Sequence, residues 1–215
     1  MSDPDGRPRV RMTGRERREQ LVQVGRSLFA EKGFDGTSIE EIAARAHVSK
    51  PVVYEHFGGK EGLYAVVVDR EMSDLLNRLT LALSAGHPRV LAEQAALALL
   101  TYIEEETDGF RILSRDSTAT GSTGAFSSLL NDIASQVEYV LAREFGQRGF
   151  STENAAMYAQ MLVGMVALTG MWWLEERKPG REEVAAHIVN LGWNGLAHLE
   201  AKPRSLTRRK GVPPE

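Results

Sequence analysis

The segment 37–63, TSIEEIAARAHVSKPVVYEHFGGKEGL, most restricts how this chain can fold. Thr37 and Ser38 each precede a glutamate by three residues, so a capping box can begin a helix from either of them. Apolar residues then follow at the i, i+3, i+4 and i+7 spacing of a single helix face. This first helix is short, and its apolar residues are Ile39, Ile42, Ala43 and Ala46.

A second short helix follows a tight turn at His47 and Val48. Ser49 can cap it, and Pro51 is tolerated in its first turn because the amide there has no helical partner. Gly58 and Gly59 end it. With Val53 and Phe57 turned inward, the outer face carries polar and small apolar side chains. Such a helix–turn–helix unit is suited to the major groove of DNA.

This segment contains, in order, the motifs T-S-x-x-x-I-A-x-x-A, V-S, V-Y-x-H-F and K-E-x-L. It resembles the DNA-binding domain of the TetR family of bacterial transcriptional regulators. Phe34 and Gly36 also match the usual entry to the motif in that family. His47 departs from the pattern, since the family most often carries glycine there. The histidine must adopt a left-handed conformation at modest cost, or avoid it.

The residues that we expect to contact DNA lie on the second helix and at the starts of its neighbours. Lys50 can donate to guanine edges, and Val52 can meet a thymine methyl group. Tyr54, His56 and Lys60 can hold phosphates. Each alone is compatible with an ordinary solvent-facing side chain, but their spacing within the motif favours DNA. The full predicted set is Thr37, Ser38, Ser49, Lys50, Pro51, Val52, Tyr54, His56 and Lys60.

Charge is unevenly distributed along the 215 residues, whose net charge is −3. Residues 1–60 carry 11 Lys+Arg and 9 Asp+Glu, residues 61–200 carry 10 and 19, and residues 201–215 carry 5 and 1. A slightly basic end on an acidic body is compatible with one DNA-facing end. The ends of the chain are predicted to be a disordered basic arm at 1–13 and a disordered basic tail at 201–215. Either can touch DNA or remain a solvated tail.

The sequence offers no chemistry typical of an enzyme. It has no cysteine, and its five histidines are scattered, so we expect no disulfide and no metal site. Nucleophile motifs, phosphate-binding glycine loops and metal-binding helix signatures are missing. We therefore expect no catalytic residues and no cofactor. The first residues form no secretory signal, which favours a cytoplasmic protein.

Helical periodicity without β-alternation predicts an all-α chain. A helix–turn–helix DNA-binding domain is expected at 14–60, and a helical regulatory and dimerisation domain at 61–200. A long helix that begins near Lys60 and ends before Gly86 and Pro88 joins the two domains. It is the natural lever between them.

The stretch Asn154 to Leu174 contains no charged residue and is long enough to raise the possibility of a membrane span. A helix buried on two sides is the preferred interpretation, with one face in its own domain and the other against a partner. The last two long helices of the TetR family usually dimerise, and the resemblance implies the same here. The expected dimer-interface residues are Leu162, Val166, Trp173, Val184, Ile188, Leu191 and Gly195.

The resemblance also implies a small-molecule pocket in the helical body. Methionine and aromatic side chains favour an apolar or aromatic effector, although the same residue types are often simply core. The candidate lining residues are Tyr102, Phe110, Leu113, Phe126, Leu130, Met161, Met165 and Trp172.

These features predict a homodimeric repressor that binds a palindromic DNA operator and is released by its effector. The effector acts only through its differential affinity for two states of the protein. One alternative is an activator or architectural DNA-binding protein without a ligand. Another is a helical small-molecule-binding protein or enzyme.

Overall fold

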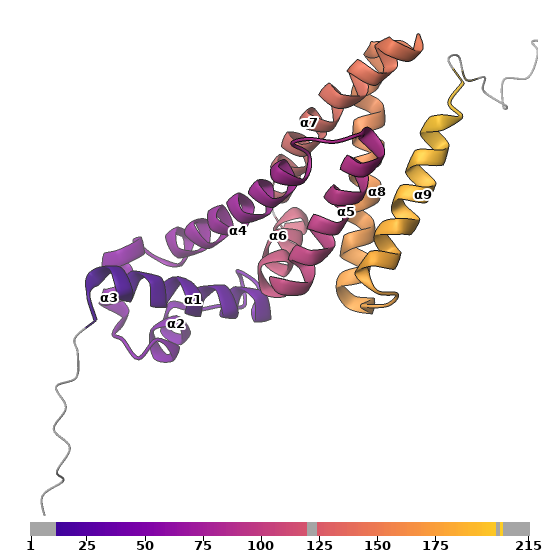
Figure 1. Cartoon of the computed structure of the whole chain (residues 1–215). Helices are drawn as coiled ribbons and strands as arrows, with labels where there is room; N and C mark the ends of the chain where they lie inside the picture. The colour runs from indigo at the N-terminus through magenta and orange to yellow at the C-terminus, as the bar shows by residue number, and fades with distance from the viewer. Residues whose placement is uncertain (1–11, 120–123, 201–202, 204–215) are drawn as a thin grey trace, which may run out of the picture. The chain divides into compact units, whose positions relative to one another are not determined.

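The computed structural model describes residues 12–119, 124–200 and 203. Throughout this part the chain is helical and contains no strand, which confirms the all-α prediction (Figure 1). The predicted arm and tail lie almost entirely outside the described residues. The α-helices are α1 (Gly14–Lys32), α2 (Ile39–Arg45), α3 (Lys50–Phe57), α4 (Lys60–Ala82), α5 (Pro88–Glu105), α6 (Thr107–Ala119), α7 (Ala125–Arg148), α8 (Ala155–Glu176) and α9 (Arg181–Ala197).

The chain forms two compact units. The first comprises Met1–Leu75 together with Glu105–Ser127, and the second comprises Leu76–Glu104 together with Ser128–Glu215. Helix α4 therefore contributes to both units. The first unit is larger than the expected 14–60 domain because α6 packs along α1 and completes it.

The first unit is built on α1. A capping box begins this helix: the Thr13 hydroxyl accepts from the Glu16 amide at 3.2 Å, and the Glu16 carboxylate accepts from the Thr13 amide at 2.7 Å. Gly33, with φ 75°, ends it. Apolar side chains line the inward face, and the buried residues are Leu21, Val22, Gly25, Leu28, Phe29 and Ala30.

Helix α6 is fastened to the end of α1. The Arg115 guanidinium donates a 2.6 Å hydrogen bond to the Ala30 carbonyl. Behind it, the buried rings of Phe110 and Phe126 meet edge to face with centroids 5.9 Å apart. A segment distant in sequence thus covers the C-terminal end of α1.

In the second unit, α8 packs against α5 and α7. A Cβ added at Gly170 would lie 2.9 Å from Cδ1 of Ile103, so α8 and α5 cross closely at this glycine. The ring of Phe145 on α7 meets that of Tyr158 on α8 edge to face at 5.5 Å. Trp173 is buried, and its indole donates to the Pro179 carbonyl at 2.7 Å, which secures the turn into α9.

Close packing at Gly25 leads to a prediction about stability. A Cβ there would lie 2.8 Å from Cδ2 of the fully buried Leu63. Gly25→Val should therefore overpack the contact between α1 and α4 and lower the free energy of unfolding by about 1–3 kcal/mol. Thermal unfolding followed by circular dichroism measures this effect.

Gly146→Ala is the matched control, because a Cβ at Gly146 meets only Thr152 at an ordinary 3.8 Å. It should raise stability by up to about 1 kcal/mol through helix propensity. An unchanged melting temperature for Gly25→Val would contradict the packing argument.

Candidate nucleic-acid interface

Ser38, rather than Thr37, begins α2. The Ser38 hydroxyl accepts from the Glu41 amide at 3.2 Å. Thr37 is only 2% exposed, and its hydroxyl donates to the Gly33 carbonyl at 2.8 Å. Thr37 therefore ties the end of α1 to the start of α2. Its burial conflicts with the expectation that it contacts DNA.

The turn between α2 and α3 takes the left-handed form. His47 has φ 54°, so it adopts the conformation in which the family prefers glycine. The Val48 amide donates to the Ala43 carbonyl at 2.9 Å, and Gln20 of α1 donates to the Ala46 carbonyl at 3.3 Å. The turn is thus fixed by local bonds and by α1.

Helix α3 turns one apolar residue inward and a mixed face outward. Val53 is fully buried, whereas the Tyr54 side chain is 53% exposed. Pro51 lies in the first turn as predicted, and Gly58 ends the helix with φ 72°. The predicted DNA-facing residues on this helix divide into the exposed Ser49, Lys50, Pro51 and Tyr54 and the half-buried Val52 and His56. Their contacts with DNA stay a prediction.

The Lys60 side chain bonds to another segment of the first unit. Its ammonium donates to the Phe34 carbonyl at 2.9 Å and lies 4.1 Å from the centroid of the Phe34 ring. Phe34 in turn packs against Tyr64, with ring centroids 4.9 Å apart. Lys60 therefore anchors the start of α4 to the connection between α1 and α2. This differs from the expected phosphate contact, which would require the amine to change partners.

Arg18 anchors the end of α3, a role that the sequence analysis did not predict. Its guanidinium donates to the His56 carbonyl at 2.7 Å and lies 4.4 Å from the centroid of the Phe57 ring. The available signal was spacing. Arg18 precedes the buried Leu21 and Val22 by three and four residues, so it shares their helix face.

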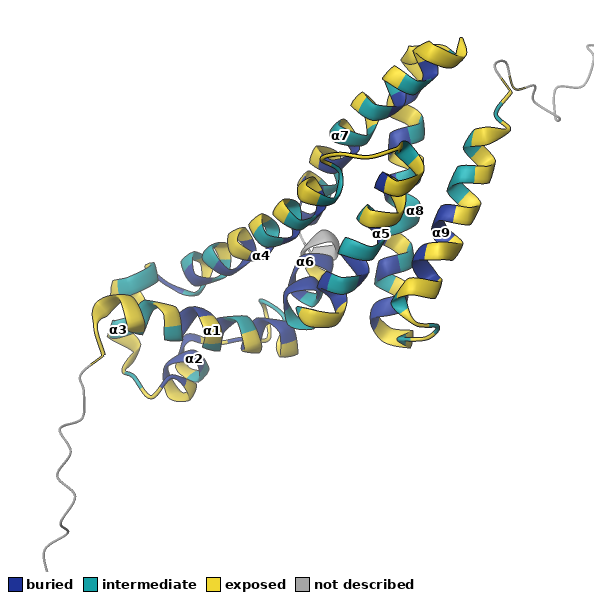
Figure 2. Ribbon diagram, in the orientation of Figure 1, coloured by how far each residue is buried: buried dark blue, intermediate teal, exposed yellow. Residues whose placement is uncertain are grey.

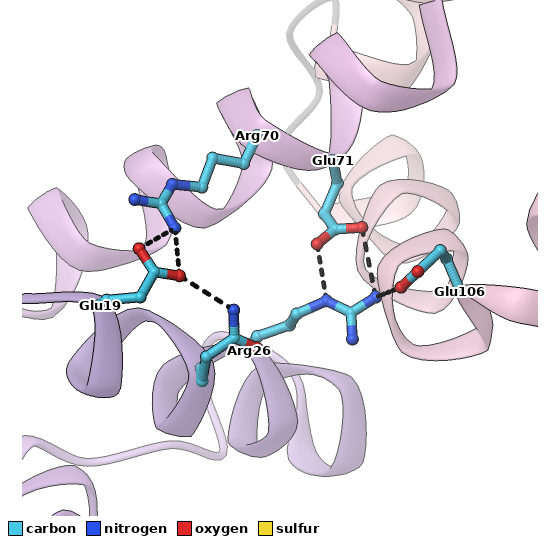
Figure 3. Close-up of polar contacts among 6 residues, drawn as sticks. Glu19, Arg26, Arg70, Glu71 and Glu106 are labelled. Atoms are coloured by element: carbon cyan, nitrogen blue, oxygen red, sulfur yellow. Dashed lines mark hydrogen bonds and ion pairs between the residues drawn. The ribbon is translucent and has the colours of Figure 1, made fainter. Parts of the chain in front are cut away.

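An ion-pair network in the first unit joins α1 to α4 and to the residue that precedes α6 (Figure 3). The Arg26 guanidinium of α1 contacts Glu71 of α4 at 2.6 Å and Glu106, just before α6, at 2.7 Å. Burial opposes the charge on Arg26, but the hydrogen bond and charge of Glu71 and the charges of Glu106 and Asp108 outweigh it and raise the Arg26 pKa. A charged Arg26 thus resists displacement of α1 from α4 and α6.

A polar cavity of about 330 Å³ lies beside this network. On its rim, Arg70 contacts Glu19 at 2.8 Å. None of the expected effector-pocket residues lines this cavity. Its lining residues are Val22, Gln23, Arg26, Val67, Arg70, Glu71, Asp74 and Glu106.

The residues expected to line an effector pocket belong partly to the first unit and partly to the second. Phe110, Leu113 and Phe126 are buried in the first unit, and Tyr102 is buried in the second. In the second unit, Leu130 and Met165 are half-buried. Met161 and Trp172 are exposed, Trp172 by 51%, so neither lies inside a pocket of the single chain.

The residues expected at a dimer interface are likewise divided. Trp173 is only 2% exposed, and Val184 and Ile188 are also buried, so their own chain already covers them. Leu162 and Val166 are half-buried, and Leu191 and Gly195 are exposed. On α8, Trp173 faces inward while Met161 and Trp172 face outward, opposite to the expectation for these three residues. Periodicity revealed two apolar faces but gave no information on which one the chain itself would cover.

Within the described residues, no group of three or more His, Asp or Glu side chains is arranged to hold a metal ion. One helical stretch among them, Thr152–Glu176, has the length and the mean hydropathy, 1.3, that a membrane crossing requires.

Ser49 precedes α3 as predicted, but its side chain makes no capping hydrogen bond. A short helix presented after a left-handed turn, and held by α1, is typical of helix–turn–helix DNA-binding proteins. Comparison with known families makes the assignment specific. Residues 21–67 match the family model of bacterial regulatory proteins of the tetR family, and residues 78–207 match the tetracyclin repressor-like C-terminal domain. The chain belongs to the TetR family of transcriptional regulators.

Individual relatives agree with this family. The chain is 28% identical over 187 residues to the HTH-type transcriptional activator FasR of Mycolicibacterium smegmatis, covering 86% of this chain and 84% of that protein. It is 39% identical over 84 residues to an HTH-type transcriptional repressor of Mycobacterium tuberculosis, covering 39% of this chain and 43% of that one. A TetR-like regulator from Rhodococcus shares the fold, with a TM-score of 0.70, 23% identity and coverage of 88% and 100%. These relatives are transcription regulators and not enzymes.

The contact between Arg18 and α3 gives a testable prediction. Arg18→Met keeps the apolar stem but removes the hydrogen bond to the His56 carbonyl and the charge over Phe57. We expect a loss of about 1.5–3 kcal/mol of stability, as for other hydrogen bonds to charged groups, together with weaker binding to every DNA sequence. Thermal unfolding and DNA titration measure the two effects.

Arg17→Met is the control, since it removes the same charge one residue away and breaks only the local bond of Arg17 to Gln20. Equal losses of stability for the two variants would rule out a specific anchoring role for Arg18.

Proposed function

We propose that this protein is a cytoplasmic, ligand-responsive repressor that binds a palindromic operator as a homodimer. Its release is caused by a small apolar or aromatic effector. The main support for DNA binding is the outward face of α3. Lys50, Pro51 and Tyr54 are exposed there, and Val53 is the only buried residue of this helix. Donors and a small apolar surface suit base edges and phosphates in the major groove.

The uncovered apolar surface of α8 and α9 supports the homodimer. Met157, Met161, Leu168 and Trp172 are exposed on α8, and Leu191, 67% exposed, stands on α9 (Figure 2). Only 28% of the apolar window of α8 is buried within the chain. In this proposal the matching surface of a second copy covers these side chains, so no lipid is needed. Two-fold symmetry then accounts for a palindromic operator.

Transmission of the effector signal is assigned to α4 and α6. Helix α4 leaves the DNA-binding motif directly after Gly59, and Arg26 couples it to α1 through Glu71. Glu106 brings the start of α6 into the same network. An effector that binds one arrangement of α4 more tightly than another changes the presentation of α3, by no more than its differential affinity allows.

The sign of regulation has a second candidate. The relative that matches 86% of this chain is named an activator, whereas two relatives named repressors match 39% and 60% of it. A reporter gene placed behind the bound DNA site distinguishes them. Lower expression in the presence of the protein supports repression, and higher expression supports activation.

Selection of bound duplexes from a random pool, at near-physiological salt because phosphate affinity depends on salt, tests the DNA function directly. We expect an enriched palindrome with half-sites about one helical turn apart. Lys50→Ala should relax preference at particular base pairs by about 1–3 kcal/mol, whereas Tyr54→Phe should weaken all sequences alike. If the folded dimer enriches no sequence, the operator proposal fails. If Lys50→Ala weakens all sequences equally, Lys50 has no base-specific role.

Leu168→Glu tests the dimer. Placing a charge in the centre of the covered surface should convert the dimer to a monomer, because an unpaired charge is costly to bury. Analytical ultracentrifugation gives the oligomeric state. Leu81→Glu changes a leucine of similar exposure on α4 and serves as the control. A Leu168→Glu protein that stays dimeric would place the interface elsewhere.

A further inference from the structure

Three cationic side chains on and beside the helix–turn–helix motif pair with carboxylates of the same unit. Lys50 of α3 pairs with Glu40 of α2. Nearby, Lys32 pairs with Glu41, and Arg45 contacts Glu31 at 3.3 Å. Residues 1–60 carry 11 Lys+Arg against 9 Asp+Glu, so there is little excess charge with which to attract DNA.

The pair between Glu40 and Lys50 is distinct because it bridges the two helices of the motif. Glu40 lies in the first turn of α2, and Lys50 is the first residue of α3. Both side chains are exposed, so the pair lies on the surface of the motif. The hydrogen bond from Lys50, together with its charge, lowers the Glu40 pKa, and the carboxylate is therefore ionised at neutral pH.

We propose that Glu40 is a specificity-determining residue that masks Lys50 against sequence-independent binding to DNA. The inference rests on the proposed DNA-binding role of α3. A lysine that replaces a counterion on the phosphate backbone gains affinity on any sequence. Lys50 cannot do so while Glu40 neutralises it, and the Glu40 carboxylate is itself repelled by phosphates.

On the operator, the balance is different. Hydrogen bonds from the Lys50 ammonium to a guanine edge compensate for the broken pair, whereas random DNA presents a guanine at that position only by chance. The ion pair therefore weakens random complexes more than the specific one. Glu40 thus increases discrimination between the operator and random DNA by repelling phosphates, and it lowers the affinity for both kinds of DNA.

The test compares the wild type with Glu40→Gln, Lys50→Gln and the double variant on a random-sequence duplex and on the duplex enriched by selection. For Glu40→Gln we expect the plot of log affinity against log salt on random DNA to become steeper by about 0.9 per protomer. Random-DNA affinity should rise by about fourfold per protomer at 0.2 M salt on the same reasoning. Affinity for the enriched duplex should rise less, so the specificity ratio falls.

The double variant separates masking from a simple change in net charge. When Lys50 is already replaced by Gln, the further change Glu40→Gln should alter the salt slope on random DNA much less than it does in the wild type. An undiminished effect would overturn the proposal. Glu31→Gln removes the same charge and a comparable ion pair, but its partner is Arg45 on α2 instead of a residue of α3. If Glu31→Gln lowers the specificity ratio equally, Glu40 has no special role.

A titration without DNA keeps this proposal distinguishable from the operator function. Carboxyl chemical shifts followed by NMR give the Glu40 pKa, which should rise when Lys50 is replaced by Gln. An unchanged pKa would overturn the masking proposal, whatever the selection experiment yields. If no sequence is enriched, the operator function fails, and the salt slope on random DNA still decides whether Glu40 masks Lys50.

Discussion

The burial of one face of α1 is the constraint on which the DNA-binding unit depends. Helices α2 and α3 have 7 and 8 residues, too few to be stable in isolation. They persist because the fully buried Leu21 and Leu28 of α1 form part of the same core as Ile42 and Val53. Polar contacts from α1 then set their positions, through Gln20 at the turn and Arg18 at the end of α3.

Several arginine and lysine side chains of the first unit hold its helices together. Arg18, Arg26, Lys60 and Arg115 each bond to a carbonyl or carboxylate of a different helix or connection. A basic residue near a DNA-binding motif is therefore weak evidence of contact with DNA. Lys50 differs in that its partner, Glu40, is exposed and can release it without disturbing the core.

Family membership supports the general function of the protein, and the details of its helical body bear on how that function is controlled. The two family models establish a DNA-binding regulator of transcription. The effector and the sign of regulation depend on the helical body, where relatives with one fold differ in their named roles. The uncovered face of α8 and the ion pairs around α4 are the features through which those finer properties are proposed to arise.

The sequence by itself determined the local structure of the motif. Ser38, Gly33 and Gly58 mark helix ends, and Pro51 marks the first turn of α3, because caps and turns depend on hydrogen bonds between residues a few positions apart. The spacing of apolar residues likewise gave α2, α3 and the two-sided character of α8.

Only the tertiary structure decided which of several equivalent surfaces became core. It buried Thr37, engaged Lys60, and turned Trp173 inward while leaving Trp172 exposed. It also placed α6 in the first unit, with Arg115 bonded to Ala30 across 85 residues of sequence. These outcomes depend on which distant segments meet, and helical periodicity contains no information about the partner of an apolar face.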